Sequence, residues 1–158
     1  MAEPDELTSL EVYNTVWPHD AVTIGAVHSY RDSAQDYIDY LVREDGVVLG
    51  SGVGAIFAYR GRRVVALITV LAGQRRRGAG TALYEAISRW ASERGVRELE
   101  VSVSGNDPES LSFALRRGFT EERRQVGLVR NAPINRLNAR LGYQPGIGRI
   151  HLVGPVIG

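Results

Sequence analysis

The feature that most constrains this sequence is an apolar strand followed by a glycine-rich turn and an amphipathic helix. The run at 64–71 predicts a buried strand, because it is short, apolar and rich in β-branched residues. Apolar residues then recur at helical spacing from Leu83 until Gly95, which is typical of a helix end. Gly78 and Gly80 therefore lie in a strand-to-helix turn.

This turn has the composition of an anion-binding site. A helix start offers unpaired backbone N–H groups and the positive end of the helix dipole. The two glycines allow close approach to the backbone, and three arginines (75–77) stand beside them. Two well-known phosphate motifs are excluded, since the chain has no lysine for a P-loop and no third glycine for a dinucleotide-binding loop.

Length and composition narrow the class of protein. The 158 residues suit one domain with a full core, and a net charge of +1 argues against a general nucleic-acid or membrane-surface binder. The absence of cysteine excludes disulfides, a thiolate nucleophile and cysteine-bound zinc, and we expect no metal site. The acidic, polar N-terminus is unlike a signal peptide, and no apolar run reaches membrane-spanning length, so we expect a cytoplasmic protein.

The patterning predicts an α+β fold with a mixed sheet. Residues 1–8 are polar, and we expect them to be frayed. The expected elements are helices near 10–17 and 22–31, strands at 36–44, 47–59 and 64–71, the central helix, a strand at 96–104, a helix from Asp107 to Arg117, and strands at 120–129 and 147–153.

Two motifs in this order resemble those of the GNAT acyltransferase superfamily. Arg75-x-x-Gly78-x-Gly80 is similar to the loop that binds the acyl-CoA pyrophosphate, and 106–119 is similar to the family's second motif. The resemblance covers about residues 9–130. It implies a mixed, mostly antiparallel central sheet flanked by helices, although the family's first strand has no counterpart in this sequence.

The resemblance implies acetyl-CoA as cosubstrate. The loop would bind the pyrophosphate, the strand end would pair with the pantetheine arm and polarise the thioester carbonyl, and the second motif would meet the pantetheine end. The implied cofactor-binding residues are Val70, Leu71, Arg75, Arg76, Arg77, Gly78, Ala79, Gly80, Thr81, Asn106, Ser110 and Phe113.

It also implies direct attack of a primary amine, from a small molecule or a peptide, on the thioester. Such a reaction needs a base for the amine proton and can use an acid for the thiolate. The family's usual glutamate is missing from 64–71, and its usual tyrosine is replaced by Ala114. Tyr13, His28 and Glu44 are the candidate substitutes. A non-catalytic acyl-CoA-binding or structural module is the alternative.

The C-terminal segment suggests a second, incomplete unit. Residues 131–143 resemble another copy of the second motif, so 1–130 would be the acyl-CoA-binding domain and 131–158 either the end of a second repeat or a plain helix-strand extension. Without a first strand, one sheet edge is open. We expect Ile147–Val153 or a partner chain to cover that edge, and we expect a homodimer, with the C-terminal segment as a candidate for exchange.

Overall fold

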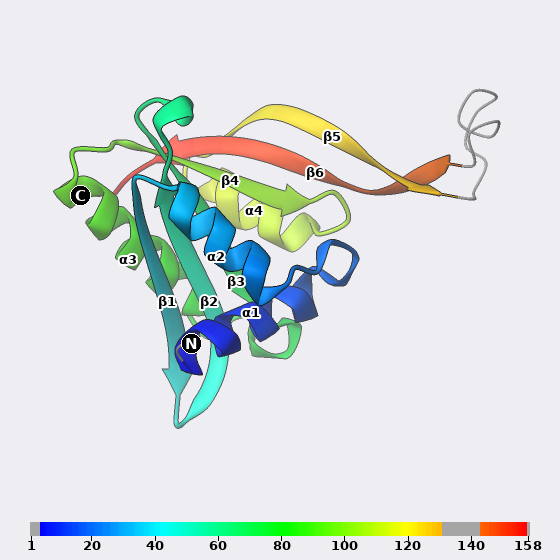
Figure 1. Cartoon of the computed structure of the whole chain (residues 1–158). Coiled ribbons are helices and arrows are strands. Elements are labelled where there is room, and N and C mark those ends of the chain that lie inside the picture. The colour runs from blue at the N-terminus through cyan, green and yellow to red at the C-terminus, as the bar shows by residue number, and fades with distance from the viewer. Residues whose placement is uncertain (1–3, 131–142, 158) are drawn as a thin grey trace. The chain divides into compact units, whose positions relative to one another are not determined.

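The computed structural model of the chain describes residues 4–130 and 143–157, and these residues form an α+β fold, as predicted (Figure 1). They contain four α-helices and six strands in a mostly antiparallel sheet. Two compact units are present, one of residues 1–99 with 156–158 and the other of residues 100–155. Each unit is described by itself.

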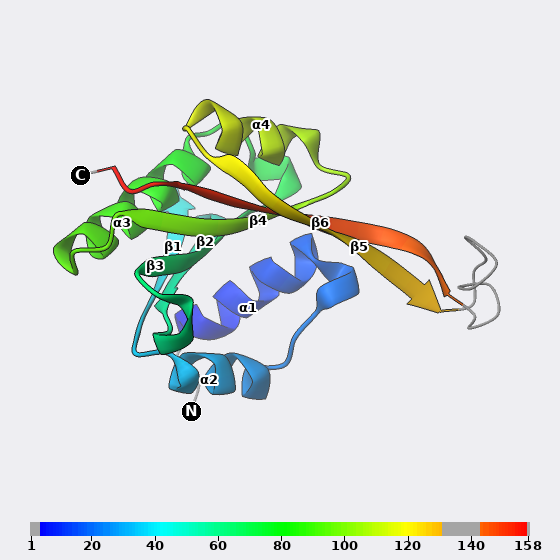
Figure 2. The same cartoon turned by 90° about the horizontal axis from the view of Figure 1, so that it is seen from above.

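The first unit is a three-strand antiparallel meander between helices. Strands β1, β2 and β3 follow one another in sequence and in space, with Asp39 opposite Val53 and Val53 opposite Leu67. Helices α1 and α2 lie on one side of these strands and α3 on the other (Figure 2). The bounds are α1 (Pro4–Val16), α2 (Ile24–Ser33), β1 (Asp36–Glu44), β2 (Val47–Ile56), β3 (Arg63–Val70) and α3 (Ala79–Glu93), with short 3-10 turns η1 (Pro18–Asp20), η2 (Ala58–Arg60) and η3 (Ala72–Gln74).

Helix α3 packs closely on β2 because β2 carries glycine on the side that faces it. A Cβ added to Gly52 would lie 2.9 Å from Leu83 Cδ2, and one added to Gly54 would lie 3.2 Å from the Trp90 ring. Leu83 and Trp90 are themselves buried, with 1% and 5% of their surface exposed. Full burial of such side chains contributes about 1.5–3 kcal/mol each, so this contact fixes the position of α3.

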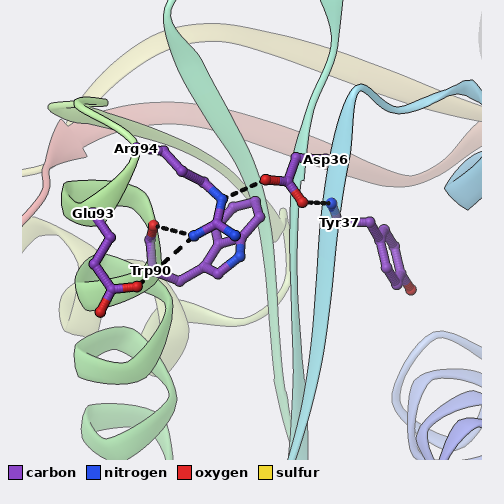
Figure 3. Close-up of polar contacts among 5 residues, drawn as sticks. All are labelled: Asp36, Tyr37, Trp90, Glu93 and Arg94. Carbon is purple, nitrogen blue, oxygen red and sulfur yellow. Dashed lines mark hydrogen bonds and ion pairs between the residues drawn. The ribbon is translucent and has the colours of Figure 1, made fainter.

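The C-terminal end of α3 is tied to the start of β1 by a polar contact (Figure 3). Arg94 Nε donates to Asp36 Oδ2, while its Nη1 donates to the Trp90 carbonyl at 3.0 Å. The guanidinium also lies over the Trp90 ring, 4.3 Å from its centroid. The hydrogen bond from Arg94 lowers the pKa of Asp36, so the carboxylate stays ionised and paired at neutral pH.

The second unit holds three strands in the order β4-β6-β5, with α4 on one side of them (Figure 2). Helix α4 begins as the sequence predicts, because Asp107 accepts from the Ser110 backbone N–H at 3.1 Å and Pro108 takes the first position. The bounds are β4 (Glu98–Ser104), α4 (Pro108–Arg116), β5 (Thr120–Arg130) and β6 (Tyr143–Pro155).

Two sequence expectations are wrong. Helix α1 starts at Pro4, so residues 4–8 are helical rather than frayed. Contacts with distant residues fix this turn, since Asp5 pairs with Arg43 at 2.8 Å and Glu6 pairs with Arg31 at 2.9 Å. The last strand, β6, pairs with β5 and β4 and therefore does not cover the open edge of β1. The helix expected at 131–143 falls almost entirely outside the described residues.

Within the ranges that the structure describes, no helix is long and apolar enough to span a membrane.

Candidate functional site

The predicted anion-binding turn is built from an unusual run of backbone conformations. After β3, the short η3 turn leads to Arg76 at φ 65° and Gly78 at φ 83°, both left-handed. Where a residue in the left-handed backbone conformation stands next to one in the right-handed conformation, successive backbone N–H groups point to the same side of the chain. Such a group of N–H donors binds anions. Glycine suits position 78 because its φ is strained for any other residue.

No side chain caps the N-terminus of α3. Gly78 occupies the N-cap without a side-chain hydrogen bond, and the first helical bond that follows runs from Ala82 N to Gly78 O at 3.0 Å. The N–H groups of Ala79 and Gly80 precede that bond, so the helix itself provides no acceptor for them. An anion at this point would meet these N–H groups and the positive end of the dipole.

The end of β3 presents backbone groups away from β2. Leu71 N donates to Leu49 O at 3.0 Å, so residue 71 is bonded on the β2 side. Because bonding alternates along an antiparallel strand, the N–H and C=O of Val70 point to the other edge. An N–H group at this position is what the resemblance requires for polarising a thioester carbonyl.

Glu44 lies beside the turn, in contact with one of its arginines. Arg77 Nη2 is 2.6 Å from Glu44 Oε2, and Arg77 Nη1 donates to Gln74 Oε1 at 2.7 Å. Both members of the ion pair are about half exposed. The pair places Glu44 next to the expected pyrophosphate position, and its carboxylate offsets part of the positive charge of the arginine run.

Tyr13 and His28 lie on the two N-terminal helices, in different surroundings. Tyr13 stacks on Trp17, with ring centroids 6.4 Å apart. His28 Nε2 is 3.2 Å from Glu6 Oε1, a carboxylate that also accepts from Arg31. The loop between these helices is fixed by Asn14, whose amide exchanges two hydrogen bonds with the backbone of Val22, at 2.8 and 2.9 Å.

The predicted residues around α4 have structural partners in their own unit. The Ser110 hydroxyl donates to Asp107 at 2.6 Å, and Asn106 accepts from the Ser104 hydroxyl at 2.6 Å. The Phe113 ring is covered by the Arg117 guanidinium, 3.4 Å from its centroid. These contacts stabilise the start and the exposed face of α4.

A partly buried carboxylate that is absent from the predicted site residues, Asp39, lies on β1. Asp39 accepts from the Ser9 hydroxyl of α1 at 2.9 Å, and burial raises its pKa to about 6. Nearby carboxylates of Glu6 and Asp5 act in the same direction. The strand pattern alone could have indicated this residue, because Asp39 shares a face with Tyr37 and Leu41.

The raised pKa of Asp39 predicts that the stability of the folded protein depends on pH. Its folded pKa lies above the unfolded value near 4, so the folded state binds the extra proton between about pH 4 and 6. Stability should therefore fall as pH rises through that window. We expect Asp39→Asn to unfold like the parent at pH 4 and to be more stable by about 1–2 kcal/mol at pH 7.5, after allowance for solvent screening.

Urea unfolding of both proteins at several pH values measures this effect. The amide introduced by Asp39→Asn keeps an oxygen that can accept from Ser9, so the variant isolates the charge. An equal stability difference at pH 4 and pH 7.5 would show that Asp39 is not the group responsible.

Most of the chain, including β3, the glycine turn and α3, matches a known protein family. The sequence model of the acetyltransferase (GNAT) family matches residues 6–119. No curated protein sequence matches the chain.

Several solved structures share the fold. A ribosomal-protein-alanine N-acetyltransferase from Brucella melitensis is 17% identical, with a TM-score of 0.67 over 98% of this chain and 96% of that one. An N-acetyltransferase from Staphylococcus aureus is 18% identical, with a TM-score of 0.69 over 99% and 96%. A Salmonella typhimurium protein, provisionally assigned as an acetyltransferase and solved with acetyl-CoA, is 16% identical, with a TM-score of 0.64 over 94% and 86%.

At these identities the structural likeness establishes the fold, and the family match covers most of the chain. The strand, the glycine turn and the helix that follows it all lie within the matched range. The chain therefore belongs to the GNAT acetyltransferase family.

Proposed function

We propose that this protein is an acetyl-CoA-dependent N-acetyltransferase that acts on a primary amine of a small molecule or a peptide. The observation that carries the proposal is the uncapped start of α3 at Gly78, directly after β3 and beside Arg75–Arg77. This arrangement suits the pyrophosphate of acetyl-CoA, because a dianion there would gain backbone hydrogen bonds, the helix dipole and guanidinium charge together.

The reaction would proceed by direct attack of the amine nitrogen on the thioester carbon. In this proposal the Val70 N–H polarises the carbonyl oxygen, and binding supplies the orientation of the two reactants. The pantetheine arm of acetyl-CoA would begin at the Val70 end of β3, next to the glycine turn. Arg75, Arg76 and Thr81 would add contacts to the phosphates.

A non-catalytic acyl-CoA-binding module is the second candidate. The absence of the family's usual base and acid favours it. Strand β3 (Arg63–Val70) carries no carboxylate, and the α4 position expected for a tyrosine is Ala114. The structure also pairs Glu44 with Arg77 and places His28 beside Glu6.

A thiol-release assay separates the two candidates. Acetyl-CoA is incubated with the protein and a panel of primary amines that includes polyamines, amino acids and peptides with free N-termini, and released CoA is followed with a thiol reagent. The proposal expects amine-dependent turnover above the uncatalysed rate, with an acetylated product detectable by mass spectrometry. Binding of acetyl-CoA without turnover on any amine would instead support the binding module.

Two further predictions concern the location of the protein in the cell and its oligomeric state. A cytoplasmic location and a homodimer remain predictions. The edge of β1 away from β2 is the place where we expect a second copy to pair, because β1 ends the strand order. Light scattering of the purified chain tests this expectation.

A further inference from the structure

The side chain of Arg77 makes two contacts that close around the left-handed part of the glycine turn. Its Nη1 donates to Gln74 Oε1 at 2.7 Å, and its Nη2 lies 2.6 Å from Glu44 Oε2. Arg75 and Arg76 stand between residues 74 and 77, so the first contact bridges the chain across them. Both terminal nitrogens of the guanidinium are therefore already bonded.

Arg76, inside that bridge, has a backbone conformation that is costly for a residue with a side chain. Its φ of 65° is left-handed, a region that a Cβ makes unfavourable. Such a conformation persists only where the surrounding structure holds it. The turn depends on it, because a left-handed residue helps to turn neighbouring N–H groups toward one side.

Glu44 can hold Arg77 because it stands on a tightly closed hairpin. The β1–β2 connection consists of Asp45 at φ 50° and Gly46 at φ 80°. Positive φ at both central positions matches the twist of an antiparallel hairpin, and Glu44 pairs with Val47 across it. The backbone that carries the carboxylate is thus fixed by strand pairing.

The same hairpin also bonds the start of the turn. The register of β1 with β2 skips Leu49, and the Leu49 carbonyl oxygen accepts from Leu71 N at 3.0 Å, where β3 ends. The hairpin therefore holds the turn at two points. One is this backbone bond at the first residue of the turn, and the other is the pair of Glu44 with Arg77 next to its last residue, Gly78.

We infer that Glu44 is a positioning residue for cofactor binding: through Arg77 it holds the glycine turn in the form that receives the pyrophosphate of acetyl-CoA. The inference rests on the proposed function, and it gives Glu44 a role other than that of a base. Both side chains are about half exposed, so solvent weakens their attraction. Loss of the contact should therefore lower the affinity for acetyl-CoA about 3- to 5-fold, the size expected of an exposed ion pair.

Two substitutions of Glu44 separate positioning from the other roles of a carboxylate. Glu44→Asp keeps the charge but is one methylene shorter, so it should lose the contact with Arg77 and the affinity that depends on it. Glu44→Gln keeps the length and an oxygen that accepts from Arg77, so it should bind more tightly than Glu44→Asp. Both variants should keep most of kcat at saturating acetyl-CoA, because the change lies in binding.

Calorimetric affinities and kcat values of these variants give results that can overturn the inference. If Glu44 were the base, Glu44→Gln would lose kcat at unchanged affinity. If Glu44 only offset the charge of the arginines, Glu44→Asp would bind like the parent and Glu44→Gln would bind more tightly than the parent. Either result contradicts a positioning role.

Arg77→Lys tests the partner of Glu44. Lysine keeps the positive charge but lacks the planar fork that bonds Glu44 and Gln74 together, so its affinity should fall by a similar factor. Glu44→Asp with Arg77→Lys should bind no more weakly than either variant alone, because both remove one contact. Additive losses overturn the inference. Glu11→Asp, exposed on α1, is the matched control and should bind like the parent.

NMR of the turn provides a readout without cofactor. A positive φ brings the amide and α protons of a residue close together, so Arg76 should show a strong NOE between them in the parent and a weaker one in Glu44→Asp. An unchanged NOE overturns the inference even if the protein is an active acetyltransferase.

Failure of the proposed function gives a different pattern. If acetyl-CoA binds but no amine is acetylated, the enzymatic proposal fails, while weaker binding by Glu44→Asp still supports the positioning role. If the parent protein binds no acetyl-CoA, the turn has no cofactor to receive, and both proposals fail.

Discussion

Gly50→Ala is expected to destabilise the protein by about 1–3 kcal/mol or more, although it adds a single methyl group. A Cβ at position 50 would lie 2.5 Å from the Thr69 carbonyl oxygen and 3.2 Å from Val70 Cα. Both are backbone atoms of β3, so no side chain can rotate to make room. Strands β2 and β3 would have to separate where β3 runs into the glycine turn.

Urea unfolding measures this loss, with Gly25→Ala as the control. Gly25 is exposed in α2, and its added Cβ would have only the Thr23 hydroxyl near it, at 3.8 Å. The same chemical change there should be neutral or slightly stabilising, because alanine favours a helix. Equal stabilities of Gly50→Ala and the parent would contradict the spacing of β2 and β3 described above.

The second large effect concerns binding. Gly80→Glu is expected to weaken acetyl-CoA binding at least about 100-fold, roughly 3 kcal/mol. The new carboxylate would stand at the second position of α3, where the pyrophosphate is expected, and two like charges would compete for the same N–H groups. Folding should not suffer, since an acidic residue in a first helical turn favours the helix.

Gly73→Glu is the charge-matched control for this variant. Gly73 lies in the η3 turn, is exposed and has nothing within 4 Å of an added Cβ. The same charge should there reduce affinity only a few-fold. Equal losses in the two variants would mean that general charge, and not the start of α3, controls binding.

The local parts of the fold could be predicted from the sequence because their causes are local. The run at 64–71, the glycine turn and the Asp107 cap each depend on neighbouring residues, and all three are present. The start of α1 could not be predicted in this way. Its first turn is polar, and it is held by Arg31 and Arg43, more than 20 positions away.

In the candidate site, too, some features have local causes and others depend on contacts between distant residues. The anion-binding turn follows from one continuous stretch, whereas Glu44 meets Arg77 only because the β1–β2 hairpin returns beside that turn. No spacing in the sequence indicates that return of the hairpin, so only the structure could bring these two residues together.

Calorimetric titration of the unmodified protein with acetyl-CoA asks whether the glycine turn and the start of α3 form a cofactor site. We expect saturable binding of one acetyl-CoA per chain, with a Kd in the range of about 1 μM to 1 mM that is usual for enzyme substrates. Binding should weaken with salt, because guanidinium groups and the helix start meet charged phosphates. An absence of binding at millimolar acetyl-CoA, in a protein shown to be folded, would mean that this turn is not an acetyl-CoA site.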